Sequence, residues 1–161
     1  MSIELTSWCA ALAAAAVAVF LTQPATANEQ AENPMVITIT TAPTSKMRYP
    51  TVGDWQFEPD GSLHITVAKM PNRHYEFLVA LHEIVEAMLC KQSGVAQHTV
   101  DNFDMSYERH RKSNDNSEPG DARGAPYHRQ HVIASVTERL AAELLKVDWN
   151  RYNDAVEAPP R

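Results

Sequence analysis

The chain has 161 residues, a formal net charge of -6 and a pI near 5.6. This length suits one small domain with a real hydrophobic core. The acidic balance argues against the broad basic surface that nucleic-acid binding requires. The one basic run, at residues 109–112, is short and is interpreted as a solvated helix end, so no nucleic-acid partner is expected.

The N-terminal region carries an apolar stretch from Trp8 to Leu21, followed by an Ala-x-Ala sequence that ends at Ala27. Such a stretch is typical of a signal-peptide core and is too short to span a membrane comfortably. However, no Lys or Arg precedes it. Two interpretations therefore stay open: an exported protein cleaved after Ala27, or a cytoplasmic protein that starts at Met35.

The first half of the remaining chain predicts strands. Residues 35–41 alternate and are β-branched, which favours a strand. Residues 53–57 and 62–69 flank Pro59-Asp60-Gly61, a turn sequence, so they are expected to form a hairpin. The second arm of this hairpin has the clearest alternating pattern in the chain.

The second half predicts helices. Asn72 is placed to cap a long helix, and Gly94 is placed to end it. A shorter helix at about residues 100–111, a polar loop at 113–125 and a last helix from Pro126 to about residue 146 follow. The predicted fold is α+β, with a small antiparallel sheet packed on two long helices and one shorter helix. The predicted divisions are a leader (1–27), a flexible linker (28–34), one metal-binding domain (35–150) and a tail (151–161).

Residues 78–89 form an apolar segment whose only ionisable side chains are His82, Glu83 and Glu86. At about 100° per residue these three side chains share one face of a helix. Buried ionisable groups are costly unless they are paired or bind a metal. His82 and Glu86, one turn apart, can therefore hold a divalent ion, and Glu83 beside them can take a proton from a metal-bound water.

The H-E-x-x-E sequence at residues 82–86, on an apolar helix that follows the strand 63–68, resembles the zincin metallopeptidases. The resemblance implies a zincin-like fold, cleavage of peptides or proteins, and a substrate that lies along the strand before the helix. The usual fifth residue of the motif is His. A carboxylate at Glu86 is a harder, more negative ligand, which suits Mn, Fe or Mg, although zinc remains the favoured metal. The wider pattern also resembles small uncharacterised phage and prophage proteins; it consists of MRYPTVGDW at 47–55, HEIVEA at 82–87, EPGD at 118–121 and APYHRQH at 125–131.

A third metal ligand is expected downstream, because a catalytic site usually takes three protein ligands and a water. The predicted last helix has an aliphatic stripe, a charged arc that includes His128, and a third face of small residues shared by His131 and Glu138. If that face meets the helix of His82, His131 becomes the third ligand and Glu138 orients it. Candidates that remain are Glu118 and Asp121 in the acidic loop, and, less favoured, Glu108 and His128.

These residues predict a metal-dependent hydrolase with Glu83 as the general base and His82, Glu86 and His131 as ligands. Two alternatives stay open. One is a Mg-dependent nucleotide pyrophosphohydrolase built on Glu83, Glu86 and Glu138. The other is a non-enzymatic phage-type accessory protein, in which the same cluster is a buried polar network or a structural ion site.

Overall fold

The computed structural model describes residues 34–113 and 115–157. The predicted leader, and the linker up to residue 33, lie outside these residues. None of the described helices is both long enough and apolar enough to cross a membrane. The elements in chain order are β1 (Ile37–Ala42), η1 (Thr44–Lys46), β2 (Gly53–Phe57), β3 (Leu63–Ala68), α2 (Arg73–Gln92), α3 (Gln97–His110), η2 (Pro119–Asp121), α4 (His128–Leu144) and α5 (Trp149–Glu157). The predicted α+β class is confirmed.

The three strands form one mixed sheet in the order β1-β3-β2. The predicted hairpin is present as an antiparallel pair of β2 and β3, whereas β1 runs parallel to β3. The sheet is not wholly antiparallel because β3, on returning from the hairpin turn, inserts between β1 and β2. The strand before the long helix, β3, is therefore central, and the expectation that a substrate lies along it is wrong. The edge strand beside the candidate site is β2.

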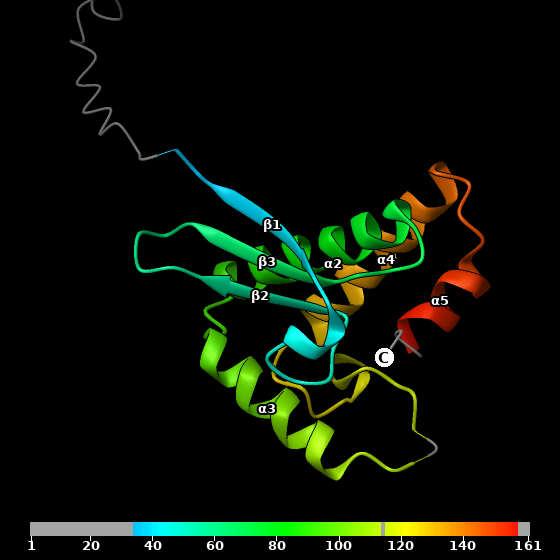
Figure 1. Cartoon of the computed structure of the whole chain (residues 1–161). Helices are drawn as coiled ribbons and strands as arrows, with labels where there is room; N and C mark the ends of the chain where they lie inside the picture. Colours follow the sequence, from blue (N-terminus) through cyan, green and yellow to red (C-terminus); the bar gives the residue numbers. More distant parts are fainter. Residues whose placement is uncertain (1–33, 114, 158–161) are drawn as a thin grey trace, which may run out of the picture. The chain divides into compact units, whose positions relative to one another are not determined.

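The long helix α2 begins and ends where its sequence predicts. The Asn72 side chain accepts a hydrogen bond from the backbone N–H of Tyr75 at 3.1 Å, which caps the first turn. Gly94 adopts a φ of 71° just beyond the helix, a conformation that glycine tolerates best. Figure 1 shows α2 between the sheet and α4, and it contacts both. The core is formed by side chains such as Ile65 and Leu78, both fully buried.

Helix α4 packs on α2 through its small-residue face. Ala134 and Ala142 are buried there, together with His131 and Glu138. Small side chains let the two helix backbones approach closely, as the sequence predicts for this face. The aliphatic stripe of α4 points away from α2, and its residues Ile133, Val136, Leu140 and Leu144 are exposed.

Two predicted boundaries are wrong. Helix α3 starts at Gln97 rather than near residue 100, and the Gln97 side chain accepts a hydrogen bond from the backbone N–H of Phe57 at 2.9 Å. The segment predicted as a tail contains α5, whose Tyr152 is 2% exposed and packs edge-on against Tyr75 at 5.1 Å between ring centroids. A helix of nine residues is marginal on its own and depends on tertiary packing, so its sequence alone did not predict it.

Candidate metal centre

His82, Glu86 and His131 meet at the interface of α2 and α4, as the sequence predicts. His82 Nε2 lies 3.2 Å from His131 Nδ1, and Glu86 Oε2 lies 3.0 Å from His131 Nδ1 and 3.5 Å from His82 Nε2. All three side chains are buried. Ligand atoms around a tetrahedral zinc ion lie roughly 3.3 Å apart, given bonds of about 2.0 Å. The three donor atoms are therefore spaced as zinc ligands are.

Glu118 extends this group from the loop before α4. Ligand atoms of His82, Glu118 and His131 all lie within 4.8 Å of one another, so these residues form a group that could hold a metal ion. His131 Nε2 lies 3.4 Å from a carboxylate oxygen of Glu118 and 3.4 Å from one of Asp121. The acidic loop thus approaches the predicted site.

The remaining ligand candidates lie elsewhere. His128 Nδ1 donates a hydrogen bond to the carbonyl oxygen of Gly120 at 2.8 Å, so this ring fixes the η2 turn. Glu108 pairs with Arg111, with its Oε2 2.8 Å from Arg111 Nε. Neither side chain is part of the His82, Glu118 and His131 group.

Glu138 orients His82, not His131 as the sequence suggests. His82 Nδ1 donates to Glu138 Oε2 at 3.0 Å, and the hydroxyl of Tyr152 donates to Glu138 Oε1. A carboxylate in this position fixes the ring and leaves Nε2 as the nitrogen with a free lone pair. Sequence reasoning missed Tyr152, because its segment reads as a tail.

Trp55 on β2 holds the other ligand carboxylate. Its indole Nε1–H donates to Glu86 Oε1 at 3.1 Å, while Glu86 Oε2 faces the two imidazoles. Trp55 is buried, and a buried indole N–H normally requires an acceptor. The sequence could therefore have indicated only that Trp55, if buried, needs an acceptor, and it could not identify Glu86 as that acceptor.

Glu83 lines a cavity of about 570 Å³ that also borders His82, Glu86 and His131. Among the described residues, no side chain donates a hydrogen bond to its carboxylate. Burial, and then the negative charge of Glu86, raise the pKa of Glu83 well above its usual value. A carboxylate with a raised pKa in a cavity is suited to accept and release protons near neutral pH.

His82, Glu86 and His131 shift one another's pKa values in the metal-free protein. Burial disfavours the charged form of Glu86, but hydrogen bonds from His131 and His82 outweigh it and lower the pKa of Glu86 to about 2. Burial likewise disfavours protonated His131, yet Asp121 and Glu86 raise the pKa of His131 to about 9. Glu138 and Glu86 raise the pKa of His82 against the effect of burial. Without a metal, bound protons therefore balance the carboxylates.

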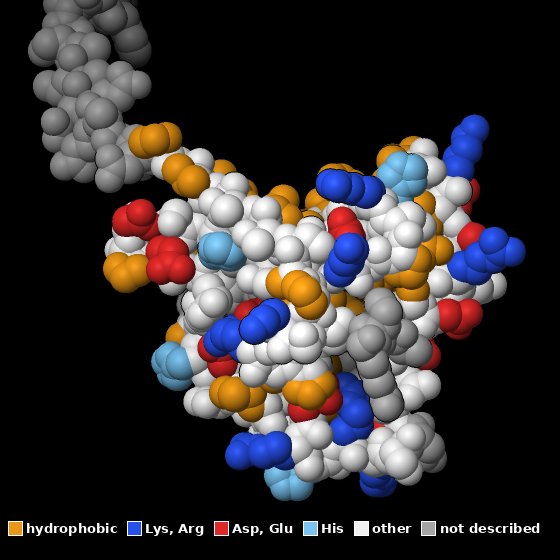
Figure 2. Space-filling model, viewed as in Figure 1, with side chains coloured by type: hydrophobic (Ala, Val, Ile, Leu, Met, Phe, Trp, Pro, Cys, Tyr) orange, Lys and Arg blue, Asp and Glu red, His pale blue; other side chains and the backbone are white. Residues whose placement is uncertain are grey.

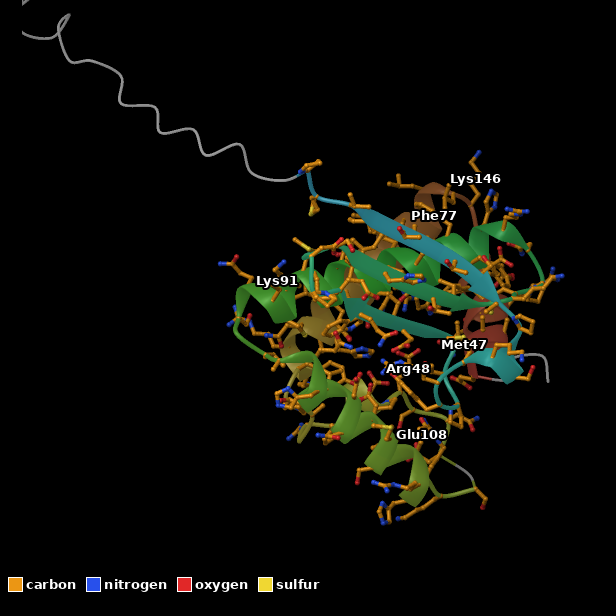
Figure 3. The ribbon with its side chains drawn as sticks, turned by 60° about the vertical axis from the view of Figure 1, so that its left-hand side comes forward. Met47, Arg48, Phe77, Lys91, Glu108 and Lys146 are labelled. Atoms are coloured by element: carbon orange, nitrogen blue, oxygen red, sulfur yellow. The ribbon has the colours of Figure 1, made fainter. Side chains whose placement is uncertain are left out.

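The cavity is also lined by Asp54, Asp101 and Asp104. Arg48 bridges Asp54 and Asp101, at 2.6 Å and 3.1 Å, and Figure 3 shows it in the space between β2 and α3. Asp104 accepts hydrogen bonds from the hydroxyls of Tyr49 and Tyr127, and burial raises its pKa to about 7. On the face shown in Figure 2, charged side chains of both signs are interspersed.

In comparisons with known proteins, no family model matches the chain, and neither a curated protein nor a solved structure matches it. Function therefore has to be inferred from the side chains of the site. The three-dimensional grouping of two histidines and several carboxylates is the feature that carries the most chemical information.

We expect the substitution Gly120→Ala to weaken metal binding. A Cβ at this position would lie 2.3 Å from His131 Cγ and 2.5 Å from Nδ1, so the ring has to move out of its ligand position. Displacing a ligand's support typically costs 10- to 100-fold in affinity, so a loss of roughly that size is expected. Competition for zinc with a chromogenic chelator measures it.

Gly124→Ala is the matched control, since its added Cβ meets nothing within 4 Å. Both variants should fold, which circular dichroism checks. Equal zinc affinities of the two variants would show that the position of the His131 ring does not matter for binding.

Proposed function

We propose that this protein is a zinc-dependent hydrolase that cleaves peptide bonds. The observation that carries the proposal is the buried triangle of His82 Nε2, Glu86 Oε2 and His131 Nδ1, with sides of 3.0 to 3.5 Å, beside the cavity of Glu83. Two imidazoles and one carboxylate are a common ligand set of catalytic zinc. Glu118 lies by the other ring nitrogen of His131, Nε2, at 3.4 Å, and with His82 and His131 forms a second possible ligand group.

Zinc is favoured over Mg or Ca because imidazole nitrogens suit zinc, whereas the harder ions prefer oxygen ligands. When bound, zinc lowers the pKa of a coordinated water to about 7 and polarises a carbonyl oxygen. The outer contacts support this role: Glu138 fixes the ring of His82, and Trp55 holds the second oxygen of Glu86.

Glu83 is the proposed general base. Its carboxylate faces the cavity beside the ligand group and is not held by any hydrogen bond from a described side chain. With its pKa raised by burial and by Glu86, it can take the proton of the attacking water and then deliver it to the leaving amine nitrogen. Gly53 leaves space for this carboxylate, since a Cβ there would lie 2.2 Å from Glu83 Oε1.

A peptide substrate is supported by the edge of β2. Along this segment the backbone groups of even-numbered residues hydrogen-bond toward β3, as those of Val52 and Glu58 do. The backbone groups of odd-numbered residues, such as Trp55, therefore face the outer edge of the sheet. Trp55 also lines the cavity. At this edge Thr51 engages Gly53 and Gln97 accepts from the Phe57 N–H, so an extended peptide would pair with the backbone of Trp55, alongside the ligand group. The cavity lining as a whole holds more acidic than basic side chains, which favours substrates that carry Lys or Arg.

The alternative of a Mg-dependent pyrophosphohydrolase has less support. It requires Glu83, Glu86 and Glu138 to act as one set of oxygen ligands. Glu138 is instead engaged by His82 and Tyr152, and two imidazoles occupy the space around Glu86. In the other alternative, an accessory protein, a structural ion site differs from the proposal in activity and not in metal content, whereas a buried polar network would bind no metal.

Metal analysis of the purified full-length protein tests the proposal directly. After incubation with zinc and removal of excess metal, we expect one equivalent of bound zinc, and less than a tenth of that for His82→Ala under competition with a chelator. His98→Ala, on exposed α3 surface, should bind as the unsubstituted protein does. Absence of bound zinc in the unsubstituted protein, or equal binding by His82→Ala, would exclude the centre proposed here.

A further inference from the structure

Helix α4 exposes an apolar face on the side opposite the metal centre. Five aliphatic side chains on this face are 41–76% exposed: Val132, Ile133, Val136, Leu140 and Leu144. At about 100° per residue they lie within one broad arc, whereas His131 and Glu138 lie on the reverse side. A continuous exposed apolar surface of this kind is typical of an interaction site.

Two charged residues stand at the ends of this same face. Arg129 lies in the first turn of α4 and Glu143 in the last, and both are exposed. Neither has an ion-pair partner among the described residues. Each also has the unfavourable sign for its end of the helix, since helix N-termini favour acidic residues and C-termini favour basic ones. A partner that supplies the opposite charge at each end would remove both conflicts.

We propose that the partner is a second copy of this chain, with the two α4 helices packed antiparallel about a two-fold axis near Val136. Positions 129 and 143 lie seven residues on either side of 136, so the axis places Arg129 of each copy opposite Glu143 of the other. It likewise places Val132 opposite Leu140. Across this axis the Arg129–Glu143 and Val132–Leu140 pairs are self-complementary, as a two-fold symmetric interface requires, while Ile133 lies opposite Arg139 and Leu144 opposite His128.

The spacing also suits helix packing. Arg129 and Glu143 are two heptads apart, and Ile133, Val136 and Leu140 between them follow the alternating spacing of three and four residues found along a helix-pair seam. The antiparallel arrangement also places the positive end of each helix beside the negative end of the other. In a parallel pair, Arg129 would face Arg129, so the charges select the antiparallel arrangement.

Helix α5 adds to this surface. A groove of about 330 Å³ lies between α4 and α5, lined by residues that include Leu140, Val147 and Trp149. Arg139 stacks over the Trp149 ring at 5.0 Å, so it covers apolar surface beside the groove. A single helix pair with such a groove is small for an interface, and a reversible dimer is expected. The metal centre, on the reverse side of α4, stays accessible in it.

Sedimentation velocity of the full chain over a concentration series tests the arrangement by charge reversal. Arg129→Glu and Glu143→Arg should each weaken the dimer about tenfold, because each creates a like-charge pair twice across the axis. The double variant Arg129→Glu/Glu143→Arg should bind within about twofold of the unsubstituted chain, since both pairs are restored with reversed sign. Val136→Glu, at the axis, should leave a monomer.

Phe77→Glu is the matched control, because Phe77 is an exposed apolar residue of α2 outside the α4 face. It should leave the dimer intact, whereas dissociation by Phe77→Glu alone would place the contact elsewhere. A chain that is monomeric at all concentrations would overturn the proposal. A double variant as weak as the single ones would exclude the antiparallel arrangement.

Discussion

Replacing Glu83 by Gln is expected to lower the rate of peptide hydrolysis about 10³-fold while zinc stays bound. Loss of a positioned general base typically costs 10²- to 10⁴-fold. The amide keeps the size of the side chain, and Gly53 leaves the same space for it, so the fold should be unaffected. Quenched fluorogenic peptides that contain Lys or Arg near the scissile bond provide the assay, and metal analysis confirms that zinc is retained.

Glu58→Gln is a suitable control, because Glu58 is an exposed acidic residue outside the cavity. It should retain full activity. Activity of Glu83→Gln equal to that of this control would remove Glu83 from the mechanism. A zinc-loaded protein that cleaves no peptide, and whose Glu83→Gln variant differs only in melting temperature, would support a structural ion site instead.

The stability of the metal-free protein is expected to fall between pH 6.5 and pH 9. The pKa of His131 rises from 6.5 to about 9 on folding, so protonated His131 stabilises the fold below pH 6.5 and this contribution is lost as the pH passes 9. His82 shifts in the same direction. The loss from His131 alone is about 3 kcal/mol, which corresponds to roughly 10 °C in melting temperature.

Zinc should reverse this trend, because it binds the neutral imidazoles and replaces the protons that balance Glu86. The rise in melting temperature on adding zinc is therefore expected to be larger at pH 8.5 than at pH 6. Circular dichroism melts with a chelator and with zinc at both pH values measure the two effects. A metal-free melting temperature that does not fall from pH 6 to pH 9 would contradict the electrostatics of the His82–Glu86–His131 group.

Much of the fold follows from local patterns in the sequence. Asn72 and Gly94 mark the ends of α2 through capping and a positive φ, and both effects act within a few residues. The hairpin of β2 and β3 follows from its turn residues and alternating strand. The placement of β1 does not, because parallel pairing with β3 depends on contacts between segments far apart in the chain.

The candidate site, like the fold, was predictable where it depends on local patterns and not where it depends on contacts between distant segments. The spacing of His82 and Glu86 within one helix is a local property, and the small residues around His131 indicated the face of α4 that meets another helix. Whether Glu138 orients His131 or His82 depends on how α4 packs on α2, so local sequence patterns could not predict it. Glu138 contacts His82, and Tyr152 contacts Glu138 from a helix that the sequence presents as a tail.

The position of Tyr152 also bears on how the protein matures in the cell. His82 leaves the ribosome about seventy residues before the tyrosine whose hydroxyl holds Glu138 in place. Until α5 emerges, the nascent chain contains Trp55, which holds Glu86, but Glu138 and Tyr152, which orient His82, are not both present. If the proposed zinc centre is correct, zinc is expected to bind tightly only after α5 has emerged, and a nascent chain that lacks α5 is expected to be inactive.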